Sequence, residues 1–233
     1  MPKFAVYHVP PEDDKLYHLG TSFLGYDIRK RKHVETSNEL QDFLGFKEEW
    51  VSKARPYGFH LTIGDSIDFE YGSLLRIERE VADILSCLNP ENSLTLKKRQ
   101  KDFVTFWGPA VVLRYDPNVH LRVLHTLIAA RVHPLGIGSG YLQRHLENPS
   151  VLKKPYHIQR TLMFYSHTIF DSYSPHFTLL NPYSGKEDNK KKLADFIAQK
   201  FDEFTDIKLT SICLLVQMHE EEMWTIYKEF TVS

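Results

Sequence analysis

A stretch near residue 60 alternates between apolar and polar side chains, as a half-buried strand does. The apolar positions are Phe59, Leu61 and Ile63, and between them stand His60 and Thr62. Successive side chains of a strand point to opposite faces, so the histidine and the threonine share one face. The apolar side chains cover the other face, which we expect to pack on a core.

The same pattern returns far downstream. His176 and Thr178 alternate with Phe177 and Leu179, directly after Pro175. Each copy follows a turn-forming residue and precedes a segment with helical spacing. We expect the two strands to face each other across a cleft, which would bring two imidazoles and two hydroxyls together.

Hydrophobic spacing predicts the remaining elements. The predicted helices are 16–23, 40–53, 74–88, 119–132, 158–166 and 190–204. The predicted strands are 3–9, 57–63, 93–99, 104–115, 175–180, 207–218 and 223–232. A glycine-rich stretch, 134–140, is predicted to be a linker between lobes or a lid over the cleft.

The predicted order repeats within the chain. Each His-x-Thr strand is followed by a helix and then by two strands, which is half of a ferredoxin-like unit. An accidental motif would not come with such a matched neighbourhood. The pattern predicts an α+β fold with an internal duplication.

Composition adds bounds to this picture. With 233 residues the chain is long enough for one large domain or two small lobes, and its net charge of −1 offers no basic field for long nucleic acid. No apolar run approaches membrane-spanning length, and no secretory signal pattern opens the chain, so we expect a cytoplasmic protein with no membrane partner. Cys87 and Cys213 lie in apolar patterns and are predicted to be buried free thiols.

Two histidines in one cleft suit the cleavage of a phosphodiester. One neutral imidazole can activate a nucleophile while one protonated imidazole donates a proton to the departing oxygen. The hydroxyls of Thr62 and Thr178 can donate hydrogen bonds to the phosphoryl oxygens. This scheme requires no metal and no cofactor, and we predict none.

The pair of motifs resembles the 2H phosphoesterase superfamily, whose enzymes carry one H-x-[ST] motif in each half of a two-lobed fold. The opening of the chain also resembles a bacterial, phosphonate-metabolism-associated branch, through the residues 4–7, 10–11, 24–27 and 55–60. That branch usually continues its first motif with a lysine, whereas Ile63-Gly64-Asp65 stands here.

The resemblance implies a single two-lobed domain over residues 1–233, in which two antiparallel-rich sheets flank a central cleft with helices outside. It also implies a metal-independent enzyme that uses His60, His176, Thr62 and Thr178 to cleave cyclic phosphates or 2′-linked phosphodiesters. We therefore expect a cyclic phosphodiesterase that acts on 2′,3′-cyclic phosphates or 2′–5′ bonds of nucleotides or short RNA.

Several residues near the motifs are candidates for substrate binding. Tyr57 and Tyr173 flank the motifs and can stack on a nucleobase, although a ring that covers the core edge is as good an interpretation. Tyr7 is a candidate through the family resemblance. Arg55 can meet a phosphate, although an exposed arginine at a helix end is the default interpretation.

Other readings of the same site stay open. A non-catalytic nucleotide- or RNA-binding module is one alternative, motivated by the missing lysine, and an RNA 2′–5′ ligase-like protein is another. A three-histidine metal site lacks any supporting spacing, such as H-E-x-x-H. The expected partner is a nucleotide or short oligonucleotide bound by a monomer. The sequence decides neither the physiological substrate nor which histidine is the acid.

Overall fold

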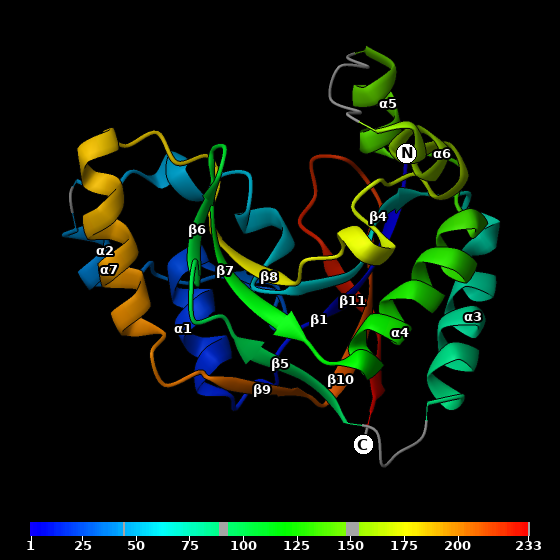
Figure 1. The fold of residues 1–233 in the computed structure, drawn as a ribbon, viewed down its shortest axis with the longest axis horizontal. Coiled ribbons are helices and arrows are strands. Elements are labelled where there is room, and N and C mark those ends of the chain that lie inside the picture. The colour runs from blue at the N-terminus through cyan, green and yellow to red at the C-terminus, as the bar shows by residue number, and fades with distance from the viewer. Residues whose placement is uncertain (44, 89–92, 148–153, 233) are drawn as a thin grey trace.

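The structure is a computed structural model that describes residues 1–43, 45–88, 93–147 and 154–232 (Figure 1). The strands are β1 (Lys3–His8), β2 (Tyr26–Asp27), β3 (Lys32–His33), β4 (Leu61–Asp68), β5 (Leu94–Lys98), β6 (Val104–Trp107), β7 (Ala110–Pro117), β8 (His176–Leu180), β9 (Asp206–Leu209), β10 (Ser211–Gln217) and β11 (Thr225–Thr231). The α-helices are α1 (Lys15–Leu24), α2 (Asn38–Gln41), α3 (Leu74–Ser86), α4 (Val119–Leu127), α5 (Gly140–Glu147), α6 (Pro155–Phe164) and α7 (Lys190–Lys200).

The two motif strands belong to one large antiparallel sheet. Within the described residues, nine strands join in the order β11-β10-β1-β4-β8-β7-β5-β9, with β6 paired to β7, while β2 and β3 form a separate pair. The prediction of antiparallel pairing with helices outside is confirmed. The prediction of two sheets is wrong, because β4 and β8 pair with each other at Leu61 and Phe177.

The repeated order of elements is present in the structure. Each motif strand, β4 and β8, is followed by one helix and then by three strands. The equivalent strands of the two halves also pair with each other, β4 with β8 and β5 with β9. Their outer neighbours differ, since β4 lies beside β1 and β8 lies beside β7.

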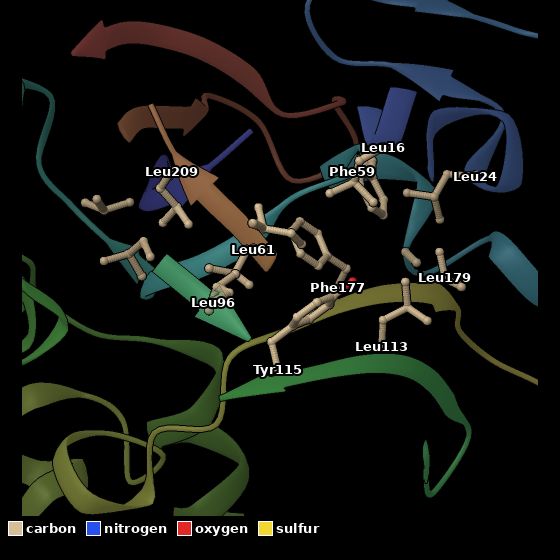
Figure 2. Close-up of a cluster of buried hydrophobic side chains, with 14 of the residues drawn as sticks. Leu16, Leu24, Phe59, Leu61, Leu96, Leu113, Tyr115, Phe177, Leu179 and Leu209 are labelled. Carbon is tan, nitrogen blue, oxygen red and sulfur yellow. The ribbon is translucent and has the colours of Figure 1, made fainter. Parts of the chain in front are cut away.

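One large core lies behind the two motif strands. It joins the apolar side chains of β4 and β8 to those of α1, α3, α4 and α7, and Figure 2 shows its centre, with Phe59, Leu61 and Phe177 among Leu16, Leu24 and Leu96. A smaller cluster on the other face of β1 and β10 includes Tyr7, Cys213 and Trp224. In Figure 1, α1, α2 and α7 lie on one side of the strands, and α3 and α4 lie on the other.

The helix predicted over 40–53 is wrong. The chain forms the short α2 and later a 3₁₀ turn at Glu48–Val51. Between them Gly45 adopts a φ of +68°, which an L residue rarely tolerates and which no α-helix contains. A single helix cannot run through Gly45, which explains why the predicted helix is not continuous.

Two predicted strands are each divided in the structure. The strand predicted over 104–115 is a hairpin of β6 and β7, turned at Gly108 with a φ of +57°. The strand predicted over 207–218 breaks at Thr210, because β9 pairs with β5 whereas β10 pairs with β1. Periodicity alone does not show such a change of neighbour.

The other helices fall where the spacing predicts them. The predicted helices 16–23, 74–88, 158–166 and 190–204 correspond to α1, α3, α6 and α7, and the helix predicted over 119–132 is α4 followed by a π turn at Ile128–Val132. Cys213 is buried as predicted, but Cys87 is exposed. In the part of the chain that the structure describes, no helix has the length and apolar character needed to span a bilayer.

Candidate active site

The first motif follows a turn that only glycine fits. A 3₁₀ turn at Arg55–Tyr57 leads into Gly58, whose φ is +65° and where an added Cβ would lie 2.6 Å from the Cβ of Ile28. His60 stands one residue before β4, and its Nδ1–H donates to the carbonyl of Gly58 at 2.9 Å. The turn thus supplies the acceptor that holds the ring.

The second motif holds its histidine in the same way. His176 is the first residue of β8, and its Nδ1–H donates to the carbonyl of Ser174 at 2.9 Å. In both copies the acceptor is the carbonyl two residues before the histidine. This bond fixes the tautomer of each neutral ring and leaves Nε2 for a ligand.

The strand register places the four motif side chains together. Leu61 pairs with Phe177, and one further step in each direction puts His60 opposite Thr178 and Thr62 opposite His176. Side chains directly opposite each other stand about 5 Å apart at Cβ, and diagonal neighbours such as the two histidines stand about 7–8 Å apart.

Aromatic packing fixes this register from behind. Phe59 and Phe177 stack with ring centroids 4.7 Å apart on the face opposite the histidines (Figure 2). Phe59, Leu61 and Ile63 are fully buried, whereas His60 and Thr62 are only partly buried. The alternation predicted from the sequence is therefore present, and the polar face is the accessible one.

The histidines and threonines of both motifs line one pocket of about 600 Å³. Its lining also includes aromatic, cationic and acidic side chains, namely those of Tyr7, Tyr57, Trp107, Lys3, Lys53, Arg144, Asp65 and Glu220. The predicted site residues of the two motifs are thus brought together from distant parts of the chain. Their roles remain predictions.

Each histidine has aromatic neighbours. The ring of His60 stacks on Tyr7 at 4.0 Å, with Tyr57 tilted against it at 6.0 Å. His176 meets Trp107 edge-on at 4.7 Å. The guanidinium of Arg114, whose backbone pairs with His176, lies 5.1 Å from the Trp107 ring.

Burial lowers the pKa of both histidines. It brings the pKa of His60 to about 4, although the hydrogen bond to Gly58 opposes the change, and the nearby His176 lowers it further. Burial also lowers the pKa of His176, while the bond to Ser174 and then the Asp65 carboxylate raise it and Arg114 lowers it. Each ring is therefore neutral near neutral pH.

Two of the four predicted substrate-binding residues line the pocket. Tyr57 is partly exposed there, with its ring stacked on the buried Trp224 at 5.4 Å. Tyr7 also lines the pocket, but one face of its ring is already covered by His60, and only 3% of the residue is exposed. Tyr57 is the better placed of the two to meet a ligand.

Tyr173 and Arg55, the other two predicted substrate-binding residues, do not line this pocket. Tyr173 is buried, its hydroxyl donates to the carbonyl of Thr62 at 3.0 Å, and its ring stacks on His125. Arg55 donates from Nε to the carbonyl of Leu24 and pairs with Glu48. Tyr173 therefore supports the first motif strand, and Arg55 ties two loops together.

Strict alternation hides one pocket residue. Counting from Thr62 places Ser66 on the polar face but Asp65 on the apolar face, yet both line the pocket. The register of β4 against β1 shifts twice, between Val6 and Tyr7 and between Phe4 and Val6, and such bulges re-aim the side chains that follow. Gly64 marks this region in the sequence, since glycine inside a strand often signals a bulge.

Other pocket residues carry no motif at all. Trp107 lies at the end of β6, and the only sequence signal is the Gly108-Pro109 turn that follows it. Lys3 and Arg144 come from β1 and α5. The stretch 134–140, predicted to be a linker or lid, bonds to β4, with the amide of Asp68 donating to the carbonyl of Gly138 at 2.8 Å, and its Gly140 lines the pocket. Among the described residues no group of three or more His, Cys, Asp or Glu side chains is arranged to hold a metal ion.

Comparison with solved structures gives a distant likeness in fold. No family model matches the sequence, and no curated protein is similar to it. A solved structure described as "Crystal structure of phosphoesterase" is similar to this chain with a TM-score of 0.44 and 10% sequence identity. The similarity covers 99% of this chain and 98% of that one.

Proposed function

We propose that this chain is a metal-independent phosphodiesterase that hydrolyses 2′,3′-cyclic phosphates or 2′–5′ bonds of nucleotides or short oligonucleotides. One observation carries the proposal: His60, Thr62, His176 and Thr178 occupy adjacent positions on two paired strands and line one pocket. The identical tethering of both Nδ1 atoms supports it, because it leaves two Nε2 atoms available to one ligand.

The proposed reaction uses the two imidazoles in opposite protonation states. A neutral ring takes a proton from the attacking water, and a protonated ring donates a proton to the departing oxygen. The pKa values of both rings are lowered by burial, and a bound phosphate offsets this by adding negative charge beside them. Substrate binding thus favours the protonation of one ring.

The threonines are proposed to hold the phosphoryl group. Extending the register from the Leu61–Phe177 pair by one residue puts Thr62 opposite His176 and Thr178 opposite His60, so each hydroxyl lies across from an imidazole. Hydroxyl groups placed in this way donate hydrogen bonds to the non-bridging oxygens, whose charge changes in the transition state.

The rest of the pocket fits a nucleotide. Its volume of about 600 Å³ is in the range of small-ligand sites. Trp107 is 37% exposed beside His176, so one face of the indole is available for a nucleobase to stack on. Lys3, Lys53 and Arg144 line the pocket and supply positive charge for a phosphate.

The test is hydrolysis of nucleoside 2′,3′-cyclic phosphates and 2′–5′ oligoadenylate in excess chelator. We expect His60→Ala and His176→Ala each to lower kcat at least about a hundredfold, as expected on removal of a general acid or base. His18→Ala, an exposed position on α1, serves as the matched control. Wild-type turnover in both variants would exclude the proposal, and tight nucleotide binding without turnover would support a binding module instead.

A further inference from the structure

The pocket continues beyond the four motif residues, in both directions along the strands. In one direction it follows β1, which pairs with β4 through Tyr7 and Thr62 and again through Lys3 and Asp68. Lys3 and Tyr7 share one face of β1 and both line the pocket. Four residues of strand separate them, which corresponds to about 13 Å at about 3.3 Å per residue. Because Tyr7 stacks on His60, Lys3 lies at an end of the pocket well away from the histidines.

A loop held by Gln217 brings an acidic side chain to the same end. Gln217 pairs with Lys3 across β10 and β1, and both residues line the pocket. The side-chain amide of Gln217 donates to the carbonyls of Glu220 at 3.2 Å and Glu222 at 2.7 Å. The carboxylate of Glu220 then lies 3.4 Å from the ammonium of Lys3. The loop after β10 is thus fixed where its acid lines the pocket.

Helix α5 closes this end from the other side. It begins two residues after Gly138, whose carbonyl accepts the amide of Asp68, the β4 partner of Lys3. One turn into α5, Arg144 lines the pocket, and its Nε donates to the carbonyl of Gly140 at 3.1 Å. We call this end the Glu220 arm, and its lining comprises Lys3, Asp65, Ser66, Arg144, Gln217 and Glu220.

In the opposite direction the pocket follows β7 and β8. Thr178 pairs with Val112, and two residues along β7 Ala110 pairs with Trp107. Asn181, three residues after Thr178, also lines the pocket. We call this end the Trp107 arm, and its lining comprises Lys53, Ala54, Pro56, Trp107, Ala110 and Asn181. The motif histidines and threonines therefore lie between two arms.

The two arms differ in chemistry. The Trp107 arm offers an indole ring that is 37% exposed, together with short apolar side chains, which suit a flat base. The Glu220 arm instead contains two cationic and two acidic side chains, besides a serine and a glutamine. Because its opposite charges are equal in number, this arm offers a second phosphate little gain. A neutral group that carries hydrogen-bond donors and acceptors finds partners there for both.

We propose that the Glu220 arm is a subsite for the second organic group of a phosphodiester. The preferred substrate then carries a nucleoside on each side of the phosphate, as a 2′–5′ dinucleotide does, with one base stacked on Trp107 and the other nucleoside in the Glu220 arm. The proposal rests on the phosphodiesterase function proposed above. In the reaction water forms the new bond to phosphorus, and one ester oxygen leaves with the electron pair of the broken bond and takes a proton.

Truncation of the substrate tests for the subsite. Adenylyl-(2′→5′)-adenosine has two nucleosides, whereas adenosine 2′-(methyl phosphate) keeps the linkage and has a methyl group in place of one of them. We expect kcat/KM to be at least about tenfold higher for the dinucleotide, because remote binding energy is lost with the truncated group.

The possible results separate the subsite from the proposed function. Equal kcat/KM for the two diesters would overturn the subsite and leave the phosphodiesterase function standing. Cleavage of adenosine 2′,3′-cyclic phosphate with neither diester cleaved would do the same. No turnover of any of the three compounds would overturn the proposed function, and the subsite with it.

Glu220→Gln and Lys3→Gln test the residues of the arm. Each should lower the ratio of kcat/KM for the dinucleotide to kcat/KM for the methyl ester at least about tenfold, because a hydrogen bond to a charged group is lost. The side chain of Glu220 is 78% exposed, so its replacement should leave the fold intact. An unchanged ratio in both variants, or an equal loss on both esters, would overturn the assignment of these residues.

Two exposed positions provide matched controls. Glu221→Gln changes the neighbouring acid on the same loop, outside the pocket lining, and Lys15→Gln changes an exposed lysine on α1. Both should keep the wild-type ratio, and a loss in Glu221→Gln equal to that in Glu220→Gln would overturn the role of Glu220.

A phosphate added to the second nucleoside tests the charge balance of the arm. The 3′-phosphate of adenylyl-(2′→5′)-adenosine should give no gain in kcat/KM over the unphosphorylated dinucleotide, because acidic side chains already match the cations. A gain of about tenfold or more would assign the arm to an anion and overturn the proposal of a neutral second group.

Discussion

Two backbone carbonyls, those of Gly58 and Ser174, orient the two motif histidines. Each takes the Nδ1–H of the ring two residues on, at 2.9 Å in both motifs. The bond costs little conformational freedom, because the acceptor belongs to the same short segment. The rings are thus oriented before any substrate arrives, which is what a proton-transfer group requires.

The threonine hydroxyls make a prediction that separates phosphate stabilisation from proton transfer. Thr62→Val and Thr178→Val remove a hydroxyl with little change in shape, and each should lower kcat about a hundredfold. The pH limits of the reaction should stay where they are, because both histidines remain. Steady-state kinetics on a 2′,3′-cyclic nucleotide across the pH range measures both quantities.

The serine variants are the matched controls for this prediction. Thr62→Ser and Thr178→Ser keep the hydroxyl and should retain most of the activity. If valine and serine variants were equally impaired, the threonines would act through packing rather than through their hydroxyls.

Helix α1 packs against Phe59, on the core side of the first motif. A Cβ added at Gly20 would lie 2.2 Å from Cδ2 of Phe59, the residue directly before His60. The Phe59 ring is stacked on Phe177 and has no room to retreat. The close approach of α1 therefore fixes the position of both motif strands.

Gly20→Ala should destabilise the protein and impair the site together. Overpacking of this kind costs about 1–3 kcal/mol, and displacement of Phe59 should lower kcat as well. Urea unfolding and turnover of the same preparation test the two effects. Gly72→Ala is the control, since nothing lies within 4 Å of a Cβ there and its φ is not positive. A normal kcat in a destabilised Gly20→Ala would show that α1 holds the fold without positioning the site.

Local patterns predict the elements whose signals are local. The helices α1 and α3 and the two alternating motif strands follow from hydrophobic spacing. Helix α4 begins after Asn118, whose side chain accepts the N–H of Leu121, as asparagine commonly does at a helix start. The single helix over 40–53 fails because a stripe that includes Leu40 and Trp50 can also be buried by a short helix and a 3₁₀ turn.

The features that the sequence does not predict depend on contacts between residues far apart in the chain. The break at Thr210 follows from a change of neighbouring strand. Asp65 enters the pocket because of bulges against β1, and Trp107 enters it because the β6–β7 hairpin ends beside His176. Tyr173 and Arg55 lie outside the pocket lining, and nearby backbone carbonyls bind their polar groups. Spacing within one segment contains none of this information.

Across the whole molecule, buried neutral histidines form hydrogen bonds between elements that are distant in the sequence. His8 donates from β1 to the carbonyl of Ser211 on β10 at 2.9 Å, and His125 links α4 to β4 and to the amide of Phe170. Burial lowers the pKa values of His8, His60 and His125 to about 4 each. The folded protein thus keeps these rings uncharged under conditions in which the unfolded chain protonates them.

This difference predicts a loss of stability in mild acid. The native pKa values lie below the ordinary value of 6.5, so the stability is fully present above pH 6.5 and falls as the pH drops towards about 4. Each of the three histidines contributes a slope of about 1.4 kcal/mol per pH unit in that window. Together they reach the scale of the whole stability of a domain, about 5–15 kcal/mol, so we expect unfolding before pH 4. Urea titrations between pH 7.5 and pH 4.5 measure the slope.

Carboxylates also take up protons in acid. One variant, His125→Gln, separates the contribution of a histidine to the loss of stability from that of the carboxylates. His125→Gln keeps a donor and an acceptor near the positions of Nδ1 and Nε2 but has no proton to gain. It should lower the stability at pH 7.5 through imperfect geometry, yet flatten the slope between pH 6.5 and pH 4.5 by about 1.4 kcal/mol per pH unit. An unchanged slope would mean that His125 is not held neutral by its place between β4 and Phe170, and that acid acts on the fold through other groups.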